Sequence, residues 1–177
     1  MTNFINFITI ARIFLAPIIL LCLIFSNYTL CIILFFLAGL TDYFDGYLAR
    51  KYNAESQIGE ILDPIADKIL IVFLLIGLSV ELDSLLMAFL SSLIIAREIG
   101  VAALRDYSSR NNISDKTKVT YLAKIKTSLQ LFSIGSYLFA LTISFNLLIL
   151  ISDIFLIIAT LITIYTGYEY TLNVFKK

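Results

Sequence analysis

The sequence predicts an all-α, polytopic membrane protein with six transmembrane helices. The chain has 177 residues, of which 60% are hydrophobic and 15% are charged, and its mean hydropathy is +0.95. A helix that crosses a bilayer needs about 20 apolar residues. Six stretches of roughly that length follow one another: residues 8–26, 29–50, 58–80, 82–104, 121–145 and 147–172.

Each predicted helix is largely apolar, and its charged residues lie at particular places along it. The first is apolar apart from Arg12, and the second ends in a polar part that runs from Asp42 to Arg50. The third begins with an acidic part and continues as a run rich in Leu, Ile and Val. The fourth carries Arg97 in its last part, the fifth carries Lys124 near its start, and the sixth is apolar over most of its length.

These helices take up nearly the whole chain, so we expect one integral membrane domain, residues 1–177. The one sizeable polar stretch is 105–119, which leaves no room for a soluble domain. No basic region precedes the first apolar segment, so no cleavable signal peptide is predicted.

Basic residues are distributed unevenly between the two ends of the predicted helices. If the helices alternate in direction, all 13 basic residues fall at one membrane face or in the helix halves next to it. The opposite loops, 27–28, 81–83 and Asn146, contain no Lys or Arg. By the positive-inside tendency, both termini and the acidic residues described next face the cytoplasm. We expect the lipid bilayer, and no nucleic acid, as a partner.

Four Asp side chains lie in or beside very apolar sequence, where each would cost about 2.5 to 3.5 kcal/mol at the bilayer centre. Oxygen-only ligands are what Mg²⁺ and Mn²⁺ prefer, so a site for divalent metal ions is the natural hypothesis. The chain contains no His, which excludes a Ser/His/Asp triad and a His-ligated zinc site. The full pattern is Asp42, Asp45, Gly46, Ala49, Arg50, Gly59, Asp63 and Asp67.

The spacing of these residues places them on two helix faces. Asp42 and Asp45 are three residues apart and share a face. Gly59, Asp63 and Asp67 follow at intervals of four and form one stripe at the start of the third helix. A short polar turn, residues 51–56, allows the two helices to lie antiparallel, so the stripes can face each other. Solvation at a helix end explains one Asp, but it does not explain four at compatible spacing.

This arrangement resembles the signature of the CDP-alcohol phosphotransferase family, and the match of its eight residues is complete. The resemblance covers roughly residues 4–130, and the apolar remainder of the last two predicted helices contributes nothing to it. Four further stretches are similar to bacterial members that use glycerol 3-phosphate. They are Asn6-x-x-Thr9-x-x-Arg12 leading to Pro17, Leu62-Asp63-Pro64-x-Ala66-Asp67-Lys68, Ala96-Arg97-Glu98-Ile99 with Leu104-Arg105, and Lys124-Ile125-Lys126-Thr127.

The resemblance implies a metal-dependent transfer of the phosphatidyl group of CDP-diacylglycerol to sn-glycerol 3-phosphate, with release of CMP. Asp67 would act as the general base. Two divalent ions, Mg²⁺ or Mn²⁺, would be held by Asp42, Asp45, Asp63 and, in part, Asp67. The CDP site would be lined by Gly46, Ala49, Arg50, Gly59 and Thr9. The resemblance also implies a homodimer in the bacterial inner membrane.

A charged acceptor requires cations of its own. Arg97 and Arg105, near the end of the fourth helix, and Lys124 and Lys126, at the start of the fifth, form a basic cluster suited to a phosphate monoester. The alternative is that these residues only orient the helices or contact lipid headgroups, which explains Lys126 as well as phosphate binding does. It explains Arg97 less well, because Arg97 lies among apolar residues.

Other functions stay open at this stage. A sibling enzyme could use inositol phosphate, serine or phosphatidylglycerol as acceptor, although the basic cluster disfavours serine. A small ion transporter or channel also carries acidic residues in its helices, but it needs polar groups through the full membrane depth. A purely structural protein would leave the acidic stripe unexplained. Three aromatic residues of the last helix, Tyr165, Tyr168 and Tyr170, are interpreted as serving packing and interfacial anchoring.

Overall fold

The computed structural model of the chain describes residues 2–52, 57–111, 113 and 121–176. The side chains of residues 2–5, 45, 47–50, 52, 57 and 60 also lie outside this description. Its six helices confirm the predicted all-α fold. They are α1 (Thr2–Ile24), α2 (Tyr28–Tyr52), α3 (Gln57–Glu81), α4 (Leu85–Arg110), α5 (Tyr121–Ile143) and α6 (Asn146–Phe175).

Helix α4 differs most from its predicted range. It starts after Ser84, whose side chain accepts a hydrogen bond from the Met87 backbone N–H and so caps the first turn. It continues to Arg110, so the prediction that the polar stretch 105–119 begins outside the helix is wrong for its first six residues. The guanidinium of Arg110 binds the Asp106 carboxylate one turn earlier at 2.9 Å, which supports the additional turn.

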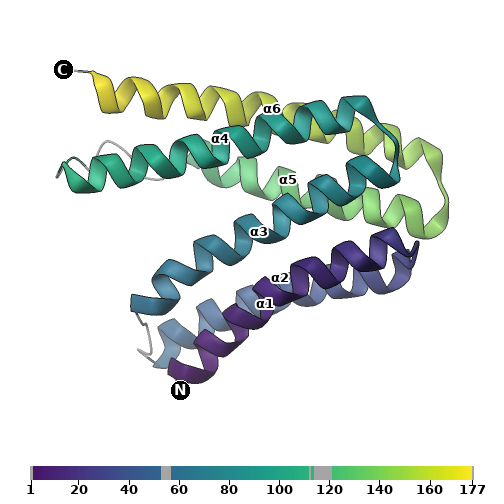
Figure 1. Cartoon of the computed structure of the whole chain (residues 1–177), viewed down its shortest axis with the longest axis horizontal. Coiled ribbons are helices and arrows are strands. Elements are labelled where there is room, and N and C mark those ends of the chain that lie inside the picture. Colours follow the sequence, from purple (N-terminus) through teal and green to yellow (C-terminus); the bar gives the residue numbers. More distant parts are fainter. Residues whose placement is uncertain (1, 53–56, 112, 114–120, 177) are drawn as a thin grey trace.

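The helices alternate in direction and form two groups (Figure 1). Helix α1 packs against α2 and α3, and α6 packs against α4 and α5, while α3 also contacts α4 and α5. Three short connections, around Ser26, Asp83 and Ser144, lie together at one end, which we call the turn end (Figure 1). Both termini lie at the other end, where the two groups of helices spread apart, and we call this the open end.

The three connections at the turn end share one backbone geometry. Ser26, Asp83 and Ser144 have positive φ angles of 55°, 45° and 53°. In each case the next backbone N–H reaches back five residues to a helix carbonyl, as in a Schellman motif: Asn27 to Cys22 at 2.8 Å, Ser84 to Ser79 at 3.3 Å and Phe145 to Ala140 at 3.0 Å. These bonds satisfy carbonyl groups that the helix ends would otherwise leave unpaired.

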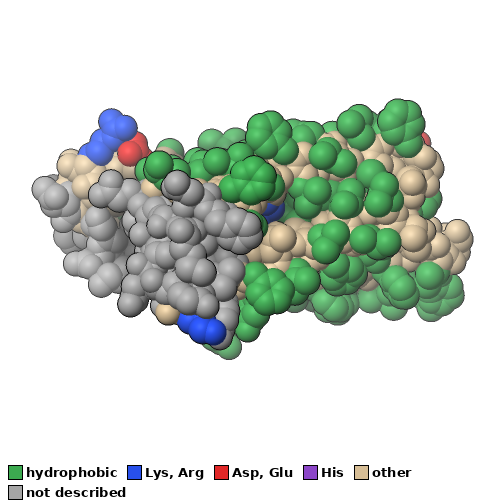
Figure 2. All heavy atoms as spheres, turned by 90° about the horizontal axis from the view of Figure 1, so that it is seen from below, with side chains coloured by type: hydrophobic (Ala, Val, Ile, Leu, Met, Phe, Trp, Pro, Cys, Tyr) green, Lys and Arg blue, Asp and Glu red, His purple; other side chains and the backbone are tan. Residues whose placement is uncertain are grey.

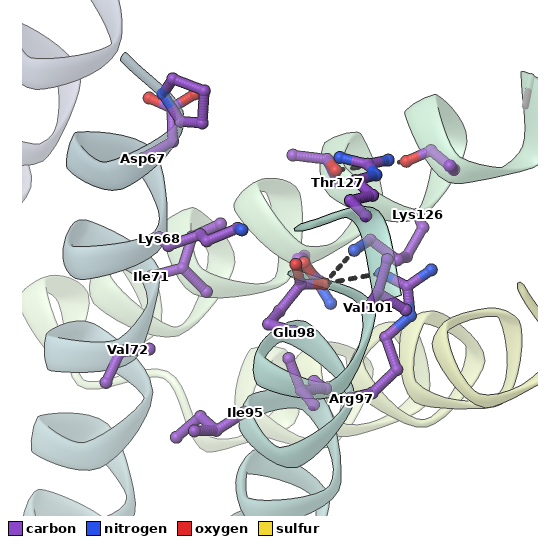
Figure 3. Close-up of a pocket in the computed structure, with 15 residues that line it drawn as sticks. Asp67, Lys68, Ile71, Val72, Ile95, Arg97, Glu98, Val101, Lys126 and Thr127 are labelled. Atoms are coloured by element: carbon purple, nitrogen blue, oxygen red, sulfur yellow. Dashed lines mark hydrogen bonds and ion pairs between the residues drawn. The ribbon is translucent and has the colours of Figure 1, made fainter. Parts of the chain in front are cut away.

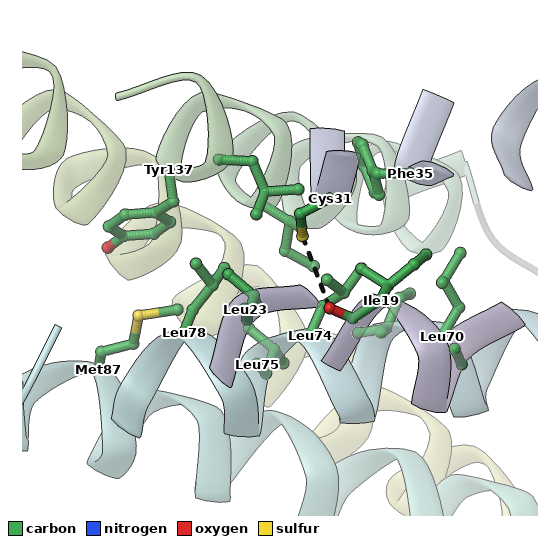
Figure 4. Packing of buried hydrophobic residues seen from close by; sticks show 14 of the residues in the cluster. Ile19, Leu23, Cys31, Phe35, Leu70, Leu74, Leu75, Leu78, Met87 and Tyr137 are labelled. Atoms are coloured by element: carbon green, nitrogen blue, oxygen red, sulfur yellow. Dashed lines mark hydrogen bonds between the residues drawn. The ribbon is translucent and has the colours of Figure 1, made fainter. Parts of the chain in front are cut away.

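The core lies where α1, α2, α3 and α5 meet (Figure 4). Its fully buried members include Ile19 of α1 and Leu74 of α3. Gly77 permits the close approach of α1 and α3, because a Cβ atom there would lie 2.6 Å from Leu20 Cδ1. Cys31 is buried with a free thiol and lies near the Ile19 carbonyl, at 3.8 Å.

Polar ties join neighbouring helices in the half of the molecule near the turn end. The Tyr28 hydroxyl of α2 donates a hydrogen bond to Glu81 of α3. The Tyr137 hydroxyl of α5 donates to Asp153 of α6 at 2.5 Å, which gives Asp153 a structural partner. Such bonds help to fix how neighbouring helices pack.

The outer surface of the described residues is largely apolar. Hydrophobic side chains cover most of the described face in Figure 2, whereas the charged side chains visible there gather mainly toward the open end. By length and composition, three segments can each cross a membrane: Asn6–Ile24, Leu85–Arg110 and Asn146–Phe175. A shorter apolar stretch, Tyr28–Phe44, lies in α2.

Candidate active site

Two of the predicted acidic residues meet on one guanidinium. Nη1 of Arg12 in α1 lies 2.5 Å from Asp42 Oδ1 of α2 and 3.0 Å from Asp67 Oδ1 of α3. The Arg12 side chain is 1% exposed, whereas both carboxylates are 49% exposed. The arginine is therefore buried beneath the acidic group, whereas the two carboxylates are half-exposed.

A third carboxylate is tied to the same helix. The hydroxyl of Thr9 donates a hydrogen bond to Asp63 Oδ1 at 2.9 Å. Thr9 and Arg12 are three residues apart on α1 and so share a face. The structure thus brings the described carboxylates of α2 and α3 together against α1. The predicted role of Thr9 in binding CDP stays a prediction.

The other members of the predicted CDP and metal sites are less completely described. Gly46 is half-buried in α2 and Gly59 is buried in α3. The side chains of Asp45, Ala49 and Arg50 lie outside the described residues. Within the described part of the chain, no group of three or more acidic, Cys or His side chains is arranged to hold a metal ion. Asp45 is not included in that finding.

A cavity of about 190 Å³ extends from Asp67 to the predicted basic cluster (Figure 3). Arg97, Arg105 and Lys126 all line it, and they come from α4 and α5. Lys124 does not: its side chain is exposed on α5 and lies outside the cavity lining. The structure therefore brings three of the four predicted cations into one cavity with the predicted base.

Helix α6 holds Arg97 in place. Nε of Arg97 donates to the Thr163 carbonyl at 3.1 Å, and Nη2 donates to Thr166 Oγ1 at 2.8 Å. Gly167 provides the room for this side chain, because a Cβ atom there would lie 2.9 Å from Arg97 Cγ. The arginine is thus fixed along its length by its neighbours on α6.

Tyr170 of α6 supports both arginines of the cavity. Its ring centre lies 5.7 Å from the guanidinium carbon of Arg97 and 5.5 Å from that of Arg105, within range of a cation–π contact. The Arg105 Nη2 atom also reaches the Tyr170 hydroxyl, at 3.4 Å. The buried Nε of Arg105 has no hydrogen-bond partner among the described residues.

One carboxylate lies among these cations. Oε1 of Glu98 accepts a hydrogen bond from Arg97 Nη1 at 3.1 Å and forms an ion pair with Lys126. The Lys126 side chain is 5% exposed and that of Glu98 is 18% exposed. Burial of Lys126 is thus compensated by a neighbouring negative charge.

A second cavity, of about 410 Å³, lies on the other side of Asp67. Apart from Arg12, Asp42 and Asp67 its lining is mostly apolar, and it includes Phe35, Phe36, Leu40 and Leu131. It shares three lining residues with the basic cavity, namely Asp67, Ile71 and Thr127. Asp67 therefore borders a basic space on one side and an apolar space on the other.

The sequence did not indicate the contribution of α6. Of the two roles predicted for the tyrosines of α6, packing and interfacial anchoring, Tyr170 has the first: it is 2% exposed and packs against the arginines. Tyr165 and Tyr168, at 59% and 62% exposed, face outward as interfacial anchoring requires. An i, i+3, i+4, i+7 spacing of Thr163, Thr166, Gly167 and Tyr170 was the one signal that could have revealed a polar face on this helix.

Comparison with known proteins identifies the class to which this fold and this site belong. The family model described as CDP-alcohol phosphatidyltransferase matches residues 2–165. The chain therefore belongs to the CDP-alcohol phosphatidyltransferase family, and its apolar helices make it an integral membrane protein.

Particular relatives are enzymes with one shared name, CDP-diacylglycerol–glycerol-3-phosphate 3-phosphatidyltransferase. The relative from Rickettsia felis is 40% identical over 174 residues, which is 95% of this chain and 93% of the relative. The one from Rickettsia bellii is 41% identical over 173 residues, with the same two shares. The one from Haemophilus influenzae is 32% identical over 167 residues, or 93% of this chain and 89% of the relative.

Proposed function

We propose that this protein transfers the phosphatidyl group of CDP-diacylglycerol to sn-glycerol 3-phosphate, giving phosphatidylglycerol phosphate and CMP. The names of the relatives support this reaction. The observation that carries the proposal is the position of Asp67 between a basic cavity and an apolar cavity. A reaction between a small charged acceptor and a lipid donor requires two such spaces at one reactive group.

The basic cavity is the site proposed for glycerol 3-phosphate. Arg97, Arg105 and Lys126 supply donors for the phosphate monoester, and Arg guanidinium groups match phosphate oxygens in pairs. Arg97 and Arg105 of α4 are held in place by contacts with α6, so little conformational freedom is lost when the phosphate binds. An acceptor without a phosphate, such as serine, has no use for these cations.

Asp67 is proposed as the general base. Its Oδ1 is bonded to Arg12, which leaves Oδ2 for the acceptor. As the acceptor's hydroxyl oxygen forms a bond to the phosphatidyl phosphorus, its proton moves to Asp67. The bond between that phosphorus and the bridging oxygen of the pyrophosphate breaks, and CMP leaves with the electron pair. Arg12 keeps Asp67 oriented during this step.

The donor is proposed to bind across α1, α2 and α3. The apolar cavity would receive the acyl part of CDP-diacylglycerol against Phe35, Leu40 and Leu131, because its lining offers the acyl chains surroundings as apolar as the bilayer. The residues proposed for its CDP part are those of the sequence pattern: Thr9, Gly46, Ala49, Arg50 and Gly59.

Members of this family generally use divalent metal ions. The donor set fits such ions, because the described carboxylates around Arg12 and Thr9 offer only hard oxygen ligands. The proposed ligands are Asp42, Asp45, Asp63 and Asp67, with Mg²⁺ or Mn²⁺ as the metal. When bound, two such ions would supply positive charge to the pyrophosphate oxygens. We further propose a homodimer of one-domain chains in a bacterial inner membrane, with the open end facing the cytoplasm.

The test is an acceptor panel with purified protein. CMP release from CDP-diacylglycerol is followed with Mg²⁺ or Mn²⁺ and, in turn, sn-glycerol 3-phosphate, inositol phosphate, serine and phosphatidylglycerol. We expect glycerol 3-phosphate to be used best, and chelation with EDTA to stop the reaction until Mg²⁺ or Mn²⁺ is restored. Faster turnover with another acceptor would reassign the acceptor, and CMP release that persists after exhaustive chelation would exclude the metal ligands.

A further inference from the structure

The carboxylate of Glu98 is unexpected in a cavity that receives a phosphate. The cavity lining contains four cations, Lys68, Arg97, Arg105 and Lys126, and two carboxylates, Asp67 and Glu98. Asp67 has a role as base. Glu98 repels a phosphate monoester that binds nearby, so its presence weakens the attraction unless it contributes a contact of its own.

Glu98 is not needed to hold the two arginines in position. Arg97 is held by Thr163 and Thr166, and Arg105 by Tyr170, all on α6. Both interactions of Glu98, with Arg97 and with Lys126, use the same oxygen, Oε1. Its second oxygen, Oε2, accepts no hydrogen bond from the described residues, although an ionised carboxylate can accept several.

The position of Glu98 suits a contact to the middle of the acceptor. In Figure 3 its carboxylate lies between α3, which carries Asp67 and Lys68, and the Lys126 side chain. An acceptor whose phosphate is bound by the cations and whose reacting hydroxyl is at Asp67 must cross the space beside Glu98. Glycerol 3-phosphate carries a second, unreacting hydroxyl on its middle carbon, and a carboxylate oxygen is the natural acceptor for that group.

We propose that Glu98 determines acceptor specificity by accepting a hydrogen bond from this unreacting hydroxyl. The site then selects a polyol phosphate over a simple hydroxyalkyl phosphate of the same length and charge. A site built to bond a substrate hydroxyl strongly rejects an analogue that lacks it, because a buried polar group is then left unpaired. This inference rests on the proposed function and adds a residue that the basic cluster does not include.

The experiment compares two acceptors that differ in one hydroxyl. CMP release by the purified full chain is measured with sn-glycerol 3-phosphate and with 3-hydroxypropyl phosphate. We expect kcat/KM to favour glycerol 3-phosphate roughly 10- to 100-fold, the range for one hydrogen bond to a charged group. In Glu98→Met, which has no acceptor oxygen, the preference should fall to within about threefold, and Glu98→Gln should lie between.

The controls separate hydroxyl recognition from ion pairing. If Glu98 is only a counter-ion of Lys126, both Glu98 variants change kcat/KM for the two acceptors by the same factor, and the unchanged preference overturns the proposal. Equal use of both acceptors by the unsubstituted protein overturns it without any variant. Ile99→Ala, at a neighbouring side chain that is 66% exposed, should keep the full preference. Failure of glycerol 3-phosphate to release CMP at all would overturn the proposed function, and with it this inference.

Discussion

Replacing Gly167 by Ala should disturb the cavity through one added carbon atom. That atom would lie 2.9 Å from Arg97 Cγ and 3.3 Å from Arg97 Nε, closer than ordinary van der Waals contact. Cγ is near the base of the side chain, so rotation of the far end does not relieve the contact. The guanidinium must move, and its hydrogen bonds to Thr163 and Thr166, at 3.1 Å and 2.8 Å, weaken.

The size of the effect follows from these contacts. Overpacking by one carbon typically costs about 1 to 3 kcal/mol, and a hydrogen bond from a charged donor contributes about 1.5 to 3 kcal/mol. If about 1.4 kcal/mol of this falls on phosphate binding, affinity drops about tenfold. We therefore expect the Michaelis constant for glycerol 3-phosphate to rise roughly tenfold, with a much smaller change in kcat.

The assay is the dependence of CMP release on glycerol 3-phosphate concentration, with CDP-diacylglycerol held at saturation. Gly100→Ala is the matched control, because nothing lies within 4 Å of a Cβ atom added at Gly100 of α4. Its Michaelis constant should stay within about twofold of the unsubstituted protein, since an added methyl group makes no new contact there. Equal Michaelis constants in Gly167→Ala and Gly100→Ala would refute the reasoning that α6 positions Arg97.

Four further substitutions test other parts of the site and fold. Asp67→Asn should abolish CMP release while the protein stays folded, and retained turnover would exclude Asp67 as the base. Arg105→Ala should raise the Michaelis constant for glycerol 3-phosphate, and an unchanged constant would argue against phosphate binding. Arg12→Met leaves Asp42 and Asp67 without their shared cation and should lower the free energy of unfolding by about 2 to 4 kcal/mol. Arg12→Lys keeps a positive charge and should lower it less. Equal thermal midpoints for the two variants would contradict this expectation. Ser144 has a left-handed backbone conformation with φ 53°, so Ser144→Gly should raise the free energy of unfolding by about 1 kcal/mol. A thermal midpoint of Ser144→Gly no higher than that of Ser144→Ala would show that this conformation is not strained.

The fold could be predicted because each helix is marked by a long apolar run, and the acidic group because its spacing repeats at helical intervals. The extension of α4 to Arg110 could not be predicted, because an ion pair supports it within a stretch whose polar sequence is typical of a loop. Tyr170 reads like Tyr168, although one is buried and the other exposed. Which of two nearby tyrosines turns inward depends on how α4 packs against α6, and no local pattern encodes that packing.

Arg12 shows a second limit of sequence reasoning. As one basic residue in the first helix, it counted toward membrane orientation and toward the family resemblance. Its position between Asp42 and Asp67 results from the packing of α1 against α2 and α3. Arg12, the cation that compensates the acidic group, thus lies 30 residues before the first of the carboxylates, Asp42.

The polar ties and tight connections at the turn end have a consequence for motion. Tyr28 with Glu81, and Tyr137 with Asp153, join neighbouring helices close to where the chain reverses, whereas the group of α1 and α2 separates from the group of α4 and α6 toward the open end (Figure 1). Amide hydrogens near the reversals should therefore exchange with deuterium more slowly than those around Asp42 and Asp67. A rigid base of this kind lets substrates of unequal size enter and leave by small changes in the spread of the helices, without unfolding any of them.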